Sequence, residues 1–253
     1  KINKPCTITK LTKRFFFNIY LMNKSYIYKD FKIQILYEDN YIAILNKPSG
    51  LLTHKKNEFD NSPSLQESLK DQFTIDDGEN YKEGIVHRLD KDTSGIIVIT
   101  KNLTSKNKFK DMFKNRNVKK NYLAFTYGLL SQNDFEINRN ISRDKIKRTK
   151  FKVSENIGKN AITKVSNVKI FHGSISLLNC QIITGRTHQI RVHLLSLGLP
   201  IIGDKDYKLN KEQKFRLANM TNDLKDLVTL FPRQALHAYK IEFNHPISKK
   251  YTK

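Results

Sequence analysis

The order of the patterned segments constrains the fold of this chain more than any other feature. Segments with the two-residue period of a strand follow one another directly, and few segments carry the period of a helix. This order predicts an α+β fold, in which helices flank a mixed, largely antiparallel central sheet. The predicted strands lie in IQILYEDNYIAILNKPSG (two strands around a polar turn at 38–40), GIVHRL, GIIVIT, KNYLAFTYGLL, 151–154, 161–171, 176–183 and ALHAYKIEFNHP.

Three segments have the apolar spacing of helices. SPSLQESLKDQF offers Ser62 as an N-cap and Pro63 for the first turn. TSKNKFKDMFKNR predicts a basic helix with Phe109, Met112 and Phe113 on one face. THQIRVHLLSLG predicts a helix that ends at Gly198. These helices are too few to cover a regularly alternating parallel sheet.

A basic segment precedes the patterned part of this 253-residue chain. Its first acidic residue is Asp30, and it contains the run FFFNIYLM. We expect residues 1–32 to form a basic N-terminal extension outside the core and residues 33–253 to form one domain. The extension could be an organellar targeting segment, a disordered arm, or sequence upstream of a true start at Met22. The chain does not begin with Met, so it could also be a fragment.

The charge balance points to a polyanionic partner. Lys and Arg number 46 against 24 Asp and Glu, which gives a net charge of +22. RNA, DNA and anionic membranes attract such chains, although an A/T-rich genome would also enrich lysine. No apolar run approaches the roughly 20 residues of a membrane span. Two cysteines cannot build a disulfide framework, which favours an intracellular, reducing compartment: the cytoplasm first, or an organelle if the extension is a targeting segment.

Asp90 is a carboxylate placed between apolar segments. HRLDKDTSG lies between Ile85-Val86 and Ile96-Ile97, and an unpaired buried carboxylate is costly. We expect two strands to hold the loop, Thr93 and Ser94 to bond its amides, and Gly95 to adopt an unusual backbone angle. From these residues alone, Asp90 could be a catalytic carboxylate or only cap a turn.

A second segment, ITGRTHQIRVH, supplies a possible counter-charge. Arg191 lies between Ile190 and Val192, so a guanidinium in that apolar context requires an anion, and Asp90 is a candidate. Such a pair would keep Asp90 ionised. Alternatively, Arg186 and Arg191 lie on a solvated helix face or bind phosphate. Within the predicted helix, His188, Arg191 and Leu195 share one face.

Other catalytic motifs are absent. AILNK followed by HRLD lacks the spacing, the Gly-rich loop and the DFG of a protein kinase. There is no GxSxG, Walker loop or GxGxxG. His188 and His193 lack the HExxH pattern of a zinc helix, and no PCxxC pair of a zinc deaminase occurs.

The collinear set of motifs resembles the RluA-type RNA pseudouridine synthases over residues 33–248. The set comprises ILYEDNYIAILNKPSGLLTH, GIVHRLDKDTSGIIVITKN, KKNYLAFTYG, ITGRTHQIRVHLLSLGLPIIGDKDY and LHAYKIEFNHP. The resemblance implies the synthase catalytic fold in residues 33–253 and isomerisation of uridine in RNA to pseudouridine, without metal, nucleotide or organic cofactor. Ribosomal RNA is the first expectation for the substrate and transfer RNA the second.

Residue by residue, the resemblance makes Asp90 the essential carboxylate, Arg191 its basic partner and Tyr122 the phenol against the base. We expect Arg88 to help hold the RNA or to fill the space that the flipped base leaves. The further expected RNA contacts are His87, Arg186 and His188.

Two departures and a rival accompany the resemblance. Residues 1–32 are too few for the RNA-binding domain that some members carry, and the chain stops soon after HPISKKYTK begins, so the last core segment could be missing. We expect a monomer that binds RNA and no membrane. The rival is a catalytically idle RNA-binding protein of the same fold.

Overall fold

The strands of this protein form one twisted sheet. The structure, a computed structural model, describes residues 24–57, 59–76, 84–130, 132–207 and 221–252. The strands are β1 (Lys24–Tyr28), β2 (Phe31–Glu38), β3 (Ile42–Lys47), β4 (Ser94–Thr100), β5 (Lys119–Tyr127), β6 (Asp134–Arg143), β7 (Phe151–Ser154), β8 (Lys159–Phe171), β9 (Ile175–Ile182), β10 (Leu236–Asn244) and β11 (Tyr251–Thr252).

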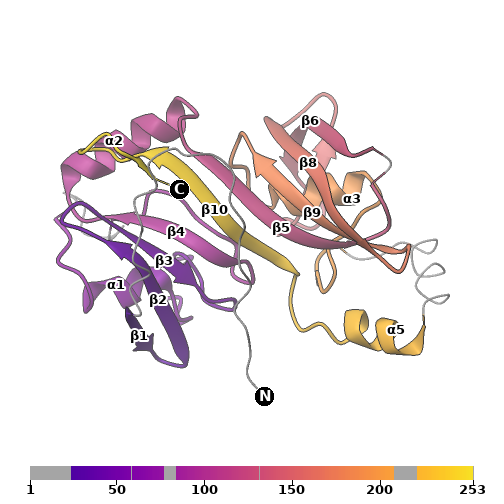
Figure 1. Cartoon of the computed structure of the whole chain (residues 1–253), viewed down its shortest axis with the longest axis horizontal. Helices are drawn as coiled ribbons and strands as arrows, with labels where there is room; N and C mark the ends of the chain where they lie inside the picture. Colours follow the sequence, from indigo (N-terminus) through magenta and orange to yellow (C-terminus); the bar gives the residue numbers. More distant parts are fainter. Residues whose placement is uncertain (1–23, 58, 77–83, 131, 208–220, 253) are drawn as a thin grey trace, which may run out of the picture.

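The sheet order confirms the predicted mixed, largely antiparallel architecture. The order is β1-β2-β3-β4-β10-β5-β9-β8-β6-β7, and β11 pairs with β10. The β4–β10 pair is parallel, whereas its neighbours β3–β4 and β10–β5 are antiparallel. Figure 1 shows β10 and β5 crossing the middle of the molecule between a lobe of β1–β4 and a lobe of β6–β9. Strand β10, although late in the chain, therefore joins the first lobe to the second.

The N-terminal hairpin of β2 and β3 forms as predicted, and one further strand precedes it. The Asp39 Oδ1 accepts hydrogen bonds from the Tyr41 and Ile42 amides at 2.7 and 2.8 Å, which closes the turn between β2 and β3. Residues 24–28, expected in the extension outside the core, instead form β1 against β2. Burial of Tyr26 in the main core ties β1 to the domain. Residues 29–32 form the turn after β1 and the start of β2, whereas residues 1–23, including the candidate targeting segment, lie outside the described residues.

The segment GIVHRL does not form the predicted strand. In the described part of the chain its pairing with the sheet is one isolated antiparallel bridge, Ile85 to Ile99. The Val98 amide donates instead to His87 Nε2 at 2.9 Å, so a side chain replaces the carbonyl that a continuous ladder would supply. The apolar run that predicted a strand reflects burial of Ile85 rather than regular pairing.

The helices lie on the faces and ends of the sheet. They are α1 (Leu65–Lys70), α2 (Leu103–Lys114), α3 (Gln189–Ser196) and α5 (Asn222–Thr229). Ser64, not the predicted Ser62, caps α1 by accepting a hydrogen bond from the Glu67 amide. His188 precedes α3 and has a left-handed backbone conformation with φ 56°. The prediction that His188 lies within this helix was therefore wrong.

Strand β6 and helix α5 were not predicted. In β6, the polar residues among Phe135, Ile137 and Ile141 obscure the two-residue period. The described helices include none that is long and apolar enough to cross a membrane.

Candidate active site

Asp90 lies in the loop between GIVHRL and β4, and several parts of the chain hold this loop. Thr53 Oγ1 donates to the Leu89 carbonyl at 2.8 Å and accepts from the Leu89 amide at 3.2 Å. Gln234 Nε2 donates to Thr93 Oγ1 at 2.6 Å. Thr53 and Gln234 come from segments far from the loop in sequence, so the Asp90 backbone is fixed from both sides.

The turn residues of the loop differ in part from the expectation. Thr93 and Ser94 do not bond the loop amides: Thr93 Oγ1 accepts from Gln234, and Ser94 Oγ lies 2.9 Å from His237 Nδ1. The special angle of Gly95 is confirmed at φ 117°, and a Cβ there would lie 2.2 Å from the Ala238 carbonyl oxygen. The missing side chain permits the close parallel contact between β4 and β10.

Lys47 is a positioning residue that the sequence reasoning missed. Its side chain is completely buried at the end of β3, and Nζ donates to the carbonyls of Pro48, Leu51 and Lys91 at 2.9, 2.6 and 3.0 Å. Burial lowers the pKa of Lys47 to about 7, and the Asp90 charge partly opposes this shift. Because Lys91 follows Asp90 directly, the ammonium joins the NKPSG turn to the Asp90 loop.

The predicted pairing of Asp90 with Arg191 is confirmed. Arg191 Nη1 donates to Asp90 Oδ2 at 3.3 Å across 101 residues of sequence. Arg191 belongs to α3, and the residue is only 5% exposed. It is therefore held by protein and not by solvent, as its apolar sequence context indicated.

Arg191 also binds two carboxylates that the sequence reasoning did not assign. Nε and Nη2 donate to the two oxygens of Asp204 at 2.7 and 2.8 Å, and Nη2 donates to Asp206 Oδ2 at 2.8 Å. The Tyr207 ring lies under the guanidinium, with Cζ 4.8 Å from its centroid. The segment GDKDY, directly after an apolar run, was the sequence signal for these groups.

This network aims the guanidinium at Asp90. The bidentate Asp204 contact fixes the guanidinium plane, which leaves Nη1 directed toward Asp90. In the described part of the chain, Asp90 Oδ1 has no hydrogen-bond partner, so one carboxylate oxygen is anchored and the other is available.

His188 lies beside the same carboxylate. Its Nε2 is 4.0 Å from Asp90 Oδ2, and its Nδ1 is 2.8 Å from the Tyr207 hydroxyl. Burial lowers the pKa of His188, and the Asp90 charge opposes the shift. His188 and Arg191 lie on the same side, as predicted. The cause is the left-handed conformation of His188 before α3, not helical spacing.

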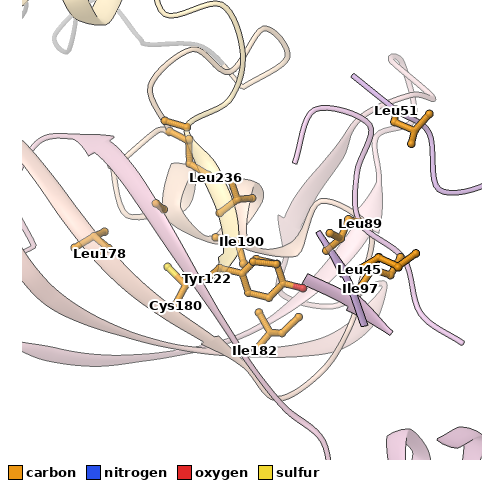
Figure 2. Packing of buried hydrophobic residues seen from close by; sticks show 14 of the residues in the cluster. Leu45, Leu51, Leu89, Ile97, Tyr122, Leu178, Cys180, Ile182, Ile190 and Leu236 are labelled. Atoms are coloured by element: carbon orange, nitrogen blue, oxygen red, sulfur yellow. The ribbon is translucent and has the colours of Figure 1, made fainter. Parts of the chain in front are cut away.

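Tyr122 projects from β5 into the apolar part of the site. It is 6% exposed, and burial together with the Asp90 charge raises its pKa. Figure 2 shows the ring among Ile182, Ile190 and Leu236, which also line the cleft. A neutral phenol with apolar walls suits contact with a planar base.

The three other predicted RNA contacts differ in exposure. Arg88 is exposed at the mouth of the cleft. Arg186 is also exposed, and its Nε donates to the Asn160 carbonyl at 3.0 Å. His87 accepts a backbone hydrogen bond, and burial lowers its pKa to about 3, so it is a neutral structural group at the cleft wall.

These residues converge on one cleft of about 480 Å³, a size typical of small-ligand sites. Its lining includes Arg88, Lys114, Arg116, Lys120, Arg186 and Arg191, whereas Asp90 is the one acidic side chain among the described lining residues. A single anchored carboxylate, a buried phenol and a ring of cations form a site for an anionic substrate with a planar, apolar part.

Comparisons with known proteins agree with this chemistry. The model of the RNA pseudouridylate synthase family matches residues 41–196. The ribosomal large subunit pseudouridine synthase D of Nitrosomonas europaea is 38% identical over 216 residues, 85% of this chain and 59% of that protein. The counterpart in Borreliella burgdorferi is 36% identical, over 84% of this chain and 61% of that protein. The chain thus spans about three fifths of the length of these relatives.

Solved structures share the fold. Human RNA pseudouridylate synthase domain containing 1 superposes with a TM-score of 0.65 at 24% identity, covering 87% of this chain and 81% of the human chain. Human RNA pseudouridylate synthase domain containing 4 gives a TM-score of 0.61 at 22% identity, covering 83% of each chain.

Proposed function

The chain belongs to the RNA pseudouridylate synthase family, and we propose that it isomerises uridine in RNA to pseudouridine. The observation that carries the proposal is the Arg191-anchored Asp90 beside buried Tyr122 in a cationic cleft. Ribosomal RNA of the large subunit is the first candidate substrate, since two similar relatives are named for it, and transfer RNA is the second.

One side of the cleft acts on the ribose of the substrate, and the other side holds the base. Asp90, held through Oδ2, acts on the ribose of a flipped uridine through Oδ1, as nucleophile or as base. The uracil lies against Tyr122 on the apolar side, where Ile190 and Leu236 exclude water and retain the detached base. The ring turns there and bonds to the ribose through a carbon in place of the nitrogen; that carbon gives up its proton and the freed ring nitrogen takes one, so the product is an isomer.

The proposal includes a monomer acting inside the cell. One chain supplies Asp90, Tyr122 and Arg191 to a single cleft, so no second subunit is needed to complete it. An RNA substrate places the activity where RNA is made or used: the cytoplasm first, an organelle second. The net charge of +22 supports salt-sensitive RNA binding.

The decisive experiment is a pseudouridine map of cellular RNA with wild-type protein, Asp90→Asn and Asp92→Asn. Asp92 lies on the same loop but does not line the cleft, so its variant controls for loop charge. We expect one or more uridine sites to lose modification in Asp90→Asn and to keep it in Asp92→Asn. If no site depends on Asp90, the idle RNA-binding protein is the correct alternative.

A second variant separates catalysis from binding. Arg191→Ala removes the buried guanidinium that holds Asp90. Pseudouridine formation should therefore collapse, while RNA affinity falls far less. Gel-shift affinity and single-turnover rates on the same transcript measure both. Equal loss of affinity and rate would make Arg191 chiefly a phosphate contact.

A further inference from the structure

Lys120 is a cleft cation to which the function described above gives no role. It lies on β5 two residues before Tyr122, so both side chains are on the same face of the strand. Its Nζ lies 5.1 Å from the centroid of the Phe113 ring, and the residue lines the cleft. Across the described ranges, the ammonium makes no hydrogen bond and no ion pair.

The Lys120 ammonium is buried and has no counter-charge among the described residues. Burial lowers the pKa of Lys120 to about 8, because the charged form is desolvated without a counter-charge. The one carboxylate of the described cleft lining, Asp90, is already bound by Arg191. The Phe113 ring supports a cation but does not neutralise it.

Gly185 lines the cleft beside this ammonium and places no side chain next to it. A Cβ added to Gly185 would lie 3.6 Å from Lys120 Nζ, so a side chain there would occupy the approach to the ammonium. Gly185 is exposed, and the exposed Arg186 follows it, with its guanidinium held by the Asn160 carbonyl. A lysine, a glycine gap and an arginine therefore meet at the edge of the cleft.

We propose that Lys120 and the gap at Gly185 form a subsite for a backbone phosphate of the RNA next to the flipped uridine, with Arg186 at its outer edge. The inference rests on the proposed function. Lys120 lies two residues along the strand from Tyr122, roughly 6.8 Å, so the phosphate sits beside the nucleotide whose base contacts Tyr122. The several cations of the cleft lining suit a polyanion such as an RNA backbone, so the anion proposed for the subsite is a phosphate.

The test compares Lys120→Gln and Gly185→Ala with Lys119→Gln. Lys119 is the adjacent lysine on the opposite face of β5 and does not line the cleft, so it matches the lost charge. Gly185 does not have a positive φ, so alanine fits its backbone and keeps every charge. All three are made in the Asp90→Asn background for binding to an in vitro transcript of large-subunit ribosomal RNA, and in the wild-type background for kinetics.

We expect Lys120→Gln to weaken binding about tenfold and to lower the slope of log Kd against log[KCl] by about 0.7, the loss of one phosphate contact. KM should rise in parallel, with a far smaller fall in kcat. Gly185→Ala should weaken binding about threefold and lower the same slope. Lys119→Gln should leave the slope at the wild-type value. Urea midpoints check that each variant is folded.

Several outcomes would overturn the subsite. These are a Lys120→Gln slope equal to that of Lys119→Gln, a fall in kcat alone, and a Gly185→Ala variant that binds as the parent does. Failure of the proposed function is a separate result: it would appear as a wild-type protein that forms no pseudouridine, whatever the salt slopes show.

Discussion

Asp204 and Asp206 offer a direct test of how Arg191 is held. Both carboxylates accept hydrogen bonds from the same guanidinium at nearly equal distances, 2.7 and 2.8 Å for Asp204 and 2.8 Å for Asp206. They differ in burial: the Asp204 side chain is fully buried, whereas the Asp206 side chain is 47% exposed. Asp204→Asn and Asp206→Asn therefore compare a buried, bidentate contact with an exposed contact of one hydrogen bond.

The expected magnitudes differ severalfold. Removing one partner of a buried ion pair costs about 3–5 kcal/mol, because the remaining charge stays desolvated. Asparagine keeps one oxygen, which still accepts from the Asp206 and Tyr207 amides, so Asp204→Asn should cost about 3 kcal/mol in the free energy of unfolding. The exposed Asp206 pair is screened by water, so Asp206→Asn should cost at most about 1 kcal/mol.

Urea unfolding measures these costs as shifts in midpoint at constant slope. Asp204→Asn should also lower the rate of pseudouridine formation more than Asp206→Asn, because Nη1 loses its fixed direction toward Asp90. Equal costs for the two variants, or an Asp204→Asn cost below about 1 kcal/mol, would refute the view that burial of Asp204 fixes Arg191.

Three further predictions concern the scaffold. Burial lowers the pKa of His193 from 6.5 to about 4, so the unfolded chain binds the proton more readily and the free energy of unfolding falls as pH drops through that window. Between pH 7 and pH 5, His193 should lower the free energy of unfolding by about 2 kcal/mol. The urea midpoint of His193→Gln should therefore fall less between these two pH values than the midpoint of the wild-type protein. Gly95→Ala should destabilise by more than about 3 kcal/mol, whereas Gly173→Ala, with nothing within 4 Å of the new Cβ, should cost about 1 kcal/mol in the same assay. Lys47→Met leaves three carbonyls without their donor and should cost about 2–4 kcal/mol by urea unfolding; a change below about 0.5 kcal/mol would contradict the structural role of this lysine.

Much of the fold follows from local sequence patterns. The two-residue period at 151–154, 161–171 and 176–183 corresponds within two residues at each end to β7, β8 and β9, because alternation records which face of a strand is buried. The same reasoning failed for GIVHRL, where an apolar run records burial but the hydrogen bonds go to a histidine side chain. Ser64 took the cap expected of Ser62, since neighbouring serines are equivalent in sequence.

The sequence by itself determined the fold class and made Asp90 and Arg191 candidate partners, with a turn-capping aspartate and a solvated arginine as the alternatives. It did so because a charge in an apolar context must find a partner. Only the tertiary structure decided the remaining partners: Lys47 on the Asp90 loop, Asp204 on Arg191, and Lys120 beside the gap at Gly185. Their roles depend on which distant loops meet and on which groups lose water, and neither is recorded in the local period of the chain.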